Sequence, residues 1–131
     1  MDKRVADVLL VLEREWRHDH RVEELATSVN LCASRLEHLF KSMLNRSIRE
    51  VIHTRRLDEA AKLIATTYER ISEIVYFVGF RDVPNFNHAF RRRFGVSPRE
   101  YRLAAHRGAV GMTPAADSTS FQQENDVEGG L

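Results

Sequence analysis

The residues of this chain that could do chemistry are mainly arginines, and they gather late in the sequence. Seven arginines lie between Gly79 and Arg107 against two acids, and three of them form the run Arg91-Arg92-Arg93. Guanidinium groups bind phosphate oxygens in a fixed, bidentate geometry, so a cluster of this kind is typical of a surface that binds a polyanion. The net charge of the whole chain, +1, hides this cluster.

The chain joins a basic part to an acidic end. Residues 1–107 hold all 20 lysines and arginines and 15 of the 19 acids, which gives this part a net charge of +5. Residues 108–131 hold four acids and no base, and they lose the hydrophobic periodicity of the preceding sequence. Their small, polar composition predicts a disordered acidic tail, which we place at 105–131.

Other reactive side chains give weaker signals. His18, Asp19 and His20 do not share one helix face and no second pair of ligands lies nearby, so we predict no metal site. Cys32 could be a redox-sensing thiol, but a small residue at a helix start is the favoured interpretation. The sequence contains no Ser/His/Asp order, no paired-carboxylate pocket and no phosphate loop, so it predicts neither an enzyme nor a cofactor.

Amphipathic helices must position the basic side chains, because apolar residues recur at helical spacing and no segment alternates like a strand. Leu36, Leu39, Phe40 and Met43 are expected to face a core. No apolar run reaches the roughly 18 to 20 residues that span a bilayer, so we expect a cytoplasmic protein. The predicted helices are one capped by Asp2, then 22–29, 33–43, 48–67, 71–78, 83–94 and one that begins at Pro98.

The chain also contains an internal repeat. At an offset of 49 residues, VEELATSVNL (22–31) lies over ISEIVYFVGF (71–80), and at an offset of 50 residues 36–41 lie over 86–91. Each copy is predicted to be a short helix, a turn and a longer helix, which is the form of a helix-turn-helix unit. We therefore predict a first subdomain at 1–47, a connecting helix at 48–67 and a second subdomain at 68–104.

Both copies continue into a helix-capping box, since Ser47 and Glu50 align with Ser97 and Glu100. In a helix-turn-helix unit the first helix braces the second, which can enter a DNA major groove about 12 Å wide. The connecting helix would be about 30 Å long, and successive major-groove faces on one side of B-DNA lie about 34 Å apart. The two recognition helices, about 33–43 and 83–94, could then enter adjacent grooves.

These motifs resemble the DNA-binding domain of the AraC/XylS family of bacterial transcription regulators over about residues 3–103. The first unit carries Leu25-Ala26 and Leu36-x-x-x-Phe40-Lys41, and the connecting helix carries Arg56-Leu57-x-x-Ala60-x-x-Leu63-Ile64. The second unit carries Ile71-x-Glu73-Ile74-x-x-x-Val78-Gly79-Phe80 and Asn85-Phe86-x-x-x-Phe90-Arg91-Arg92-x-Phe94-Gly95-x-Ser97-Pro98-x-x-Tyr101-Arg102.

The resemblance implies an all-α fold of about seven helices, with two homeodomain-like helix-turn-helix units joined by a long helix. It implies a sequence-specific regulator that binds double-stranded DNA in the bacterial cytoplasm, associates with the nucleoid, and recruits or obstructs RNA polymerase as a monomer or weak dimer. Many family members carry a separate effector-binding or dimerisation domain, and these 131 residues hold none. The chain is therefore either a stand-alone regulator or part of a longer one.

Register with the family's groove-reading positions implies two groups of DNA-binding residues. Asn85 can read adenine, histidines can donate to guanine, and Glu37 repels phosphate unless it accepts from a cytosine amino group, so the first unit should contribute less affinity. The alternative is that these residues are solvated polar side chains on exposed helix faces. The expected base readers are Ser34, Glu37, His38, Val83, Asn85 and His88, and the expected phosphate contacts are Lys41, Arg46, Arg81, Arg91 and Arg92.

Several positions depart from the family pattern or have two interpretations. Asn45 replaces a usual glycine, and Arg21 and Arg70 replace serines that usually cap a helix, which predicts caps that are weaker or lie at a neighbouring residue. One of the three consecutive arginines must point away from DNA, and we expect Arg93 to form an ion pair instead. Arg56 is either a partner of nearby acids or a DNA ligand.

Two other classes of protein fit the same sequence. A non-specific DNA-organising protein would share its charge pattern but would select no consensus site. A helix-turn-helix module repurposed for protein–protein interaction would share its fold but would not bind DNA. Glu37, on the groove-facing side of the first unit, is the residue that favours this last class.

Overall fold

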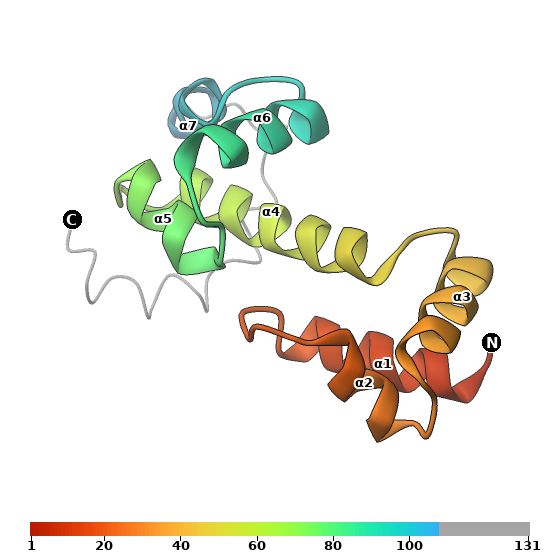
Figure 1. The fold of residues 1–131 in the computed structure, drawn as a ribbon. Coiled ribbons are helices and arrows are strands. Elements are labelled where there is room, and N and C mark those ends of the chain that lie inside the picture. The colour runs from red at the N-terminus through yellow and green to blue at the C-terminus, as the bar shows by residue number, and fades with distance from the viewer. Residues whose placement is uncertain (108–131) are drawn as a thin grey trace. The chain divides into compact units, whose positions relative to one another are not determined.

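The computed structural model describes residues 1–107, and these form helices joined by short turns (Figure 1). They divide into two compact units, one of Met1–Arg56 and one that begins at Leu57. The described part contains seven helices and no strand, which confirms the predicted all-α class. None of these helices is long and apolar enough to cross a membrane. The helices are α1 (Lys3–Arg14), α2 (Val22–Ser28), α3 (Ala33–Leu44), α4 (Ile48–Thr66), α5 (Ile71–Val78), α6 (Val83–Phe94) and α7 (Pro98–His106).

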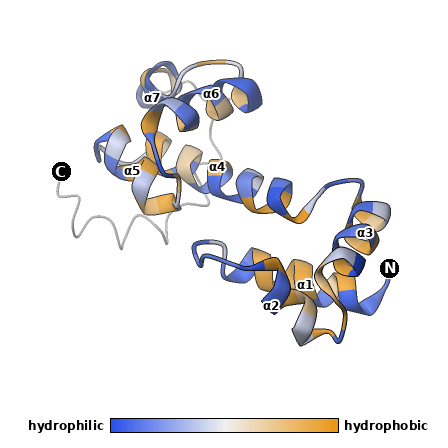
Figure 2. Cartoon of the chain, in the orientation of Figure 1, coloured by the Kyte–Doolittle hydropathy of each residue, from blue (hydrophilic) through white to orange (hydrophobic). Residues whose placement is uncertain are grey.

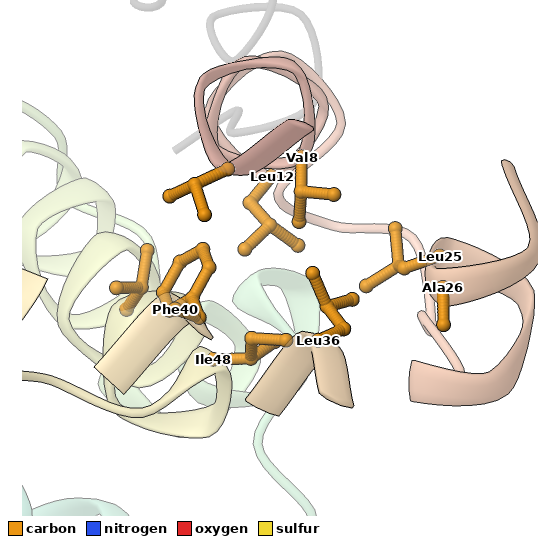
Figure 3. Close-up of a cluster of buried hydrophobic side chains, with 9 residues drawn as sticks. Val8, Leu12, Leu25, Ala26, Leu36, Phe40 and Ile48 are labelled. Atoms are coloured by element: carbon orange, nitrogen blue, oxygen red, sulfur yellow. The ribbon is translucent and has the colours of Figure 1, made fainter. Parts of the chain in front are cut away.

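The first unit packs α1, α2 and α3 around a small apolar core that the start of α4 completes. Figure 3 shows side chains from all four helices pointing toward one another in this cluster. The rings and branches that fill it include Leu12, Leu36 and Phe40, none of which is exposed to solvent at all. Burial of one such side chain contributes about 1.5–3 kcal/mol to the free energy of folding, so packing in this core is the main interaction that holds α3 in place.

The second unit has a core of the same kind but with more aromatic rings. Phe86 lies 5.1 Å from Phe80 and 5.5 Å from Phe90, measured between ring centroids, and Phe90 lies 5.4 Å from Tyr101 of α7. Aromatic pairs at such separations add stability beyond the area they bury. Figure 2 shows apolar and polar residues alternating along the helices, as expected for helices with one buried face.

The two copies of the repeat share their structure position by position. From 33 to 50 and from 83 to 100 the helix limits are the same, and every pair of equivalent residues has the same degree of burial. The turns also match. Asn30 (φ 60°) and Asn45 (φ 58°) of the first unit stand where the second unit has Gly79 (φ 108°) and Gly95 (φ 82°). Both turns need a left-handed residue, and asparagine tolerates that conformation better than most other side chains do.

Helix caps agree with the sequence in detail. The carboxylate of Asp2 accepts from the N–H of Arg4 at 2.8 Å, as predicted. Both capping boxes form, since the hydroxyls of Ser47 and Ser97 accept from the third amide of α4 and α7 at 3.0 and 3.1 Å. Arg21 and Arg70 occupy the N-caps of α2 and α5 without a side-chain hydrogen bond, so these caps are weak as expected.

Two details differ from the sequence-based expectation. Met43 was predicted to face the core, but it is 45% exposed, and Leu44 packs against the cluster beside Leu39 instead. Met43 lies three residues after the buried Phe40 and Leu44 lies four residues after it, and the buried stripe of α3 continues at Leu44. At the other end of the chain α7 continues to His106, so residues 105 and 106 are helical, and the remainder of the predicted acidic tail, 108–131, lies outside the described residues.

Arg56 has a structural role in the first unit. Its guanidinium donates to the carbonyl oxygens of Trp16 at 3.0 Å and His18 at 3.1 Å, and so holds the segment that follows α1. Burial lowers the pKa of Arg56, an effect that the nearby Asp19 carboxylate opposes. Of the two interpretations that the sequence left open, the structure favours a structural partner, with backbone carbonyls as its acceptors.

Candidate nucleic-acid interface

The outer face of α3 carries the predicted base readers of the first unit. Ser34, Glu37 and His38 are all exposed, while Leu36 and Phe40 on the opposite face are fully buried. The core therefore fixes the orientation of the helix and places these three side chains on its solvent-facing side, where a partner can reach them.

Cys32 begins the same helix. It is the N-cap of α3 and is exposed. The N–H of Arg35 and the hydroxyl of Ser34 lower the pKa of its thiol. A thiolate here would add negative charge beside the predicted readers, where it would oppose phosphate binding.

The outer face of α6 carries the second set of readers. Asn85 and His88 are exposed and Val83 is half-buried. Asp82 caps this helix by accepting from the N–H of Asn85 at 2.8 Å, so the start of α6 is well defined. His88 and His38 occupy equivalent positions of the repeat, and both are exposed.

The three consecutive arginines of α6 divide into two groups. Arg93 donates to both carboxylate oxygens of Asp58, at 2.8 and 3.1 Å, which confirms the predicted ion pair. Arg91 and Arg92 are exposed, and no hydrogen bond or ion pair joins them to another residue of the described part. These two guanidinium groups are therefore available to an anion. The other predicted phosphate contacts, Lys41, Arg46 and Arg81, are also exposed.

The second unit contains a groove of about 520 Å³ where the starts of α5 and α7 meet α6. Two predicted readers, Val83 and His88, line this groove together with Arg91, whereas Asn85 does not. Further lining residues were not predicted from the sequence. They include Ser72, Asn87 and Arg99.

The acids near this surface are occupied by helix capping. The N–H and hydroxyl of Ser97 lower the pKa of Glu100, and Arg91 adds to the effect. In the first unit the N–H of Ser47 lowers the pKa of Glu50 in the same way. Both carboxylates therefore remain charged and bound to a helix start at neutral pH.

The described residues contain no group of three metal-binding side chains. The rings of His18 and His20 lie 4.9 Å apart, centroid to centroid, and contact each other edge to face. His20 also hydrogen-bonds to the carbonyl oxygen of Glu15 at 2.8 Å. This cluster therefore packs the turn after α1.

Known proteins share this arrangement. A helix-turn-helix domain model matches residues 25–104. The arabinose operon regulatory protein of Salmonella typhimurium is 33% identical over 103 residues, which cover 78% of this chain and 37% of that protein. The chain spans less than half the length of the curated relatives that it matches.

Two solved structures have the same fold. A transcriptional regulator from Chromobacterium violaceum with an AraC-type DNA-binding domain matches with a TM-score of 0.72 and 25% identity, over 79% of this chain and 92% of that one. The DNA-binding domain of AdpA, a global transcriptional factor in complex with a target DNA, matches with a TM-score of 0.72 and 25% identity, over 84% of this chain and 98% of that one. The fold is thus one of DNA-binding transcription regulators, and the chain belongs to the AraC-type helix-turn-helix family.

Proposed function

We propose that this chain binds double-stranded DNA in a sequence-specific manner and regulates transcription, with α3 and α6 as its recognition helices. The observation that carries the proposal is the pair of exposed helix faces, each held by a buried core and bordered by cations. The similarity to the arabinose operon regulatory protein and to the DNA-bound domain of AdpA supports the same function.

Two kinds of contact to DNA would contribute to binding. We propose that base edges are read by Ser34, Glu37 and His38 on α3 and by Val83, Asn85 and His88 on α6. A histidine can donate to guanine, and the amide of Asn85 can pair with adenine. Contacts to phosphate would supply affinity without sequence information. The proposed phosphate contacts are Lys41, Arg46, Arg81, Arg91 and Arg92.

Selection of binding sites from random duplexes tests this function. We expect an asymmetric site of two boxes about one helical turn apart, with α3 and α6 in adjacent major grooves. Binding without a recovered consensus would instead indicate a non-specific DNA-organising protein. Absence of binding at low salt would leave a protein-interaction module and would overturn the proposal.

A single substitution then tests the assignment of the readers. His88→Ala should change the preferred base at one position of the selected site, at a cost of about 1–3 kcal/mol there. His18→Ala, at an exposed histidine outside both proposed recognition helices, is the matched control. An unchanged preference in His88→Ala would show that the reading face is assigned incorrectly. We further propose that the chain contacts RNA polymerase, which a pull-down experiment can check. We also propose that it binds DNA as a monomer or weak dimer, which sedimentation measurements of the mass of the DNA complex can check.

A further inference from the structure

The groove of the second unit has a lining that the proposed base and phosphate contacts do not fully use. Its walls carry two guanidinium groups, Arg91 and Arg99, and the neutral polar side chains of Ser72 and Asn87. His88 lies at the same groove. No carboxylate is among its lining residues in the described part of the chain.

Neither guanidinium group is engaged by the rest of residues 1–107. Arg91 and Arg99 are exposed, and neither makes a hydrogen bond or an ion pair with a described residue. The charge of Arg91 helps to lower the pKa of Glu100, but the two residues form no ion pair. The carboxylate of Glu100 instead accepts a hydrogen bond from the N–H of Ser97, with 3.0 Å between the nitrogen and Oε1. Two available guanidinium groups around a polar groove suit an anion with several acceptor oxygens.

The internal repeat supplies a comparison within the same chain. The first unit keeps two cations at the equivalent positions, but it replaces the two neutral side chains by carboxylates. The net charge of these four positions is therefore zero in the first unit and two positive charges in the second. The capping glutamate is present in both units and cancels from the comparison. The equivalent pairs are Ser72 and Glu23, Asn87 and Glu37, Arg91 and Lys41, and Arg99 and Arg49.

We propose that this groove binds one phosphate of the DNA backbone between Arg91 and Arg99, and that the first unit has no equivalent two-cation site because Arg49, the equivalent of Arg99, contacts no phosphate. The inference rests on the proposed DNA binding and adds Arg99 as a phosphate contact. The two non-bridging oxygens of a phosphodiester can accept from both guanidinium groups. In the first unit, Glu23 and Glu37 would repel a phosphate placed beside Arg49.

The magnitude follows from the release of counterions. Each neutralised phosphate contributes about 0.9 to the slope of log K against log salt concentration. On going from 1 M to 0.1 M salt, one such contact therefore raises the affinity about eightfold. Because Arg91 and Arg99 share one phosphate, loss of both should remove about one phosphate's share of the slope. Two independent phosphates would remove about twice as much.

Ser72→Glu is the most direct test, because it introduces the residue that the first copy already has. Ser72 is exposed in the first turn of α5, where a carboxylate favours helix formation, so the variant should fold. We expect it to bind a random-sequence duplex about eightfold more weakly at 0.1 M salt, with a slope about 0.9 shallower. Arg99→Gln should weaken binding in the same direction but by a smaller factor, because Arg91 remains on the shared phosphate, whereas Arg49→Gln in the first unit should leave the slope unchanged.

Fluorescence anisotropy across a salt series gives both quantities, and circular dichroism confirms the fold of each variant. Wild-type slope and affinity in Ser72→Glu and Arg99→Gln would overturn the groove while leaving DNA binding intact. Failure of the wild-type chain to bind any duplex would overturn both. At matched ionic strength inorganic phosphate should displace DNA no better than chloride, and strong competition by phosphate would identify a site for a small anion instead.

Discussion

Substitution of Arg92 and Arg93 in turn should separate a DNA-binding arginine from a structural one in the same run. Arg93 holds both carboxylate oxygens of Asp58, and its guanidinium lies 5.6 Å from the ring centroid of Phe94. Arg92 is exposed and makes no hydrogen bond or ion pair within residues 1–107. The two residues have the same chemistry and neighbouring positions, so each variant is a control for the other.

The expected magnitudes follow from this geometry. Both side chains of the Arg93–Asp58 pair are 39% exposed, and ion pairs with such exposure contribute about 0.2–1 kcal/mol. The bidentate contact favours the upper end of that range, and the contact with Phe94 adds about 0.5 kcal/mol. Arg93→Gln should therefore lower the free energy of unfolding by about 1 kcal/mol, which lowers the Tm of a small domain by about 4–8 °C. Arg92→Gln should leave the Tm unchanged.

DNA binding should show the opposite order. Arg92→Gln removes one proposed phosphate contact, so the slope of log K against log salt should become about 0.9 shallower. Arg93→Gln should leave the slope at the wild-type value. Thermal unfolding followed by circular dichroism and anisotropy titrations over a salt series measure the two effects separately. An equal loss of slope in both variants would place Arg93 on the DNA and would refute the reasoning from its ion pair.

Three further substitutions probe the scaffold. Arg56→Gln should lower the free energy of unfolding by about 1.5–3 kcal/mol, measured by urea unfolding, because it removes charged donors from the carbonyl oxygens of Trp16 and His18. Ser97→Ala should cost about 1 kcal/mol in the same assay through loss of a helix cap, with exposed Ser72→Ala as its control. Burial, with the charges of neighbouring arginines, lowers the pKa of His53. The unfolded chain therefore binds more protons than the folded one, and stability should fall as the pH drops below about 6.5. His53→Gln should make stability depend less on pH in this range, and an unchanged pH profile of stability would contradict this prediction.

The fold could be predicted from the sequence because its determinants are local. The spacing of apolar residues predicted the helices. Asp2 and the two S-x-x-E boxes predicted three helix starts, and the structure has a helix cap at each of them. Met43 was predicted incorrectly because an apolar stripe on a helix can continue at either i+3 or i+4, and here it continues four residues after Phe40, at Leu44. Its equivalent in the second copy is Arg93, an exposed residue in an ion pair, so comparison of the two copies carried the correct signal.

The candidate site could be predicted only in part. The exposed faces of α3 and α6 follow from helical periodicity, because each lies opposite a buried stripe. The groove does not follow from it, since Ser72, Asn87 and Arg99 come from three different helices and meet only after folding. Their signal in the sequence is the change of charge between the copies, where Glu23 and Glu37 stand at the positions of Ser72 and Asn87.

The matched burial of 33–50 and 83–100 has a consequence for how such a chain can change. A homodimer must alter both of its readers with every mutation, because one gene encodes the two surfaces. Here each copy has its own codons, and its outward positions can drift without repacking the inward ones. When the two copies diverge in this way, the DNA site that they bind becomes asymmetric, so the protein binds it in one orientation. Libraries varied only at outward positions should yield folded proteins with new DNA-sequence preferences.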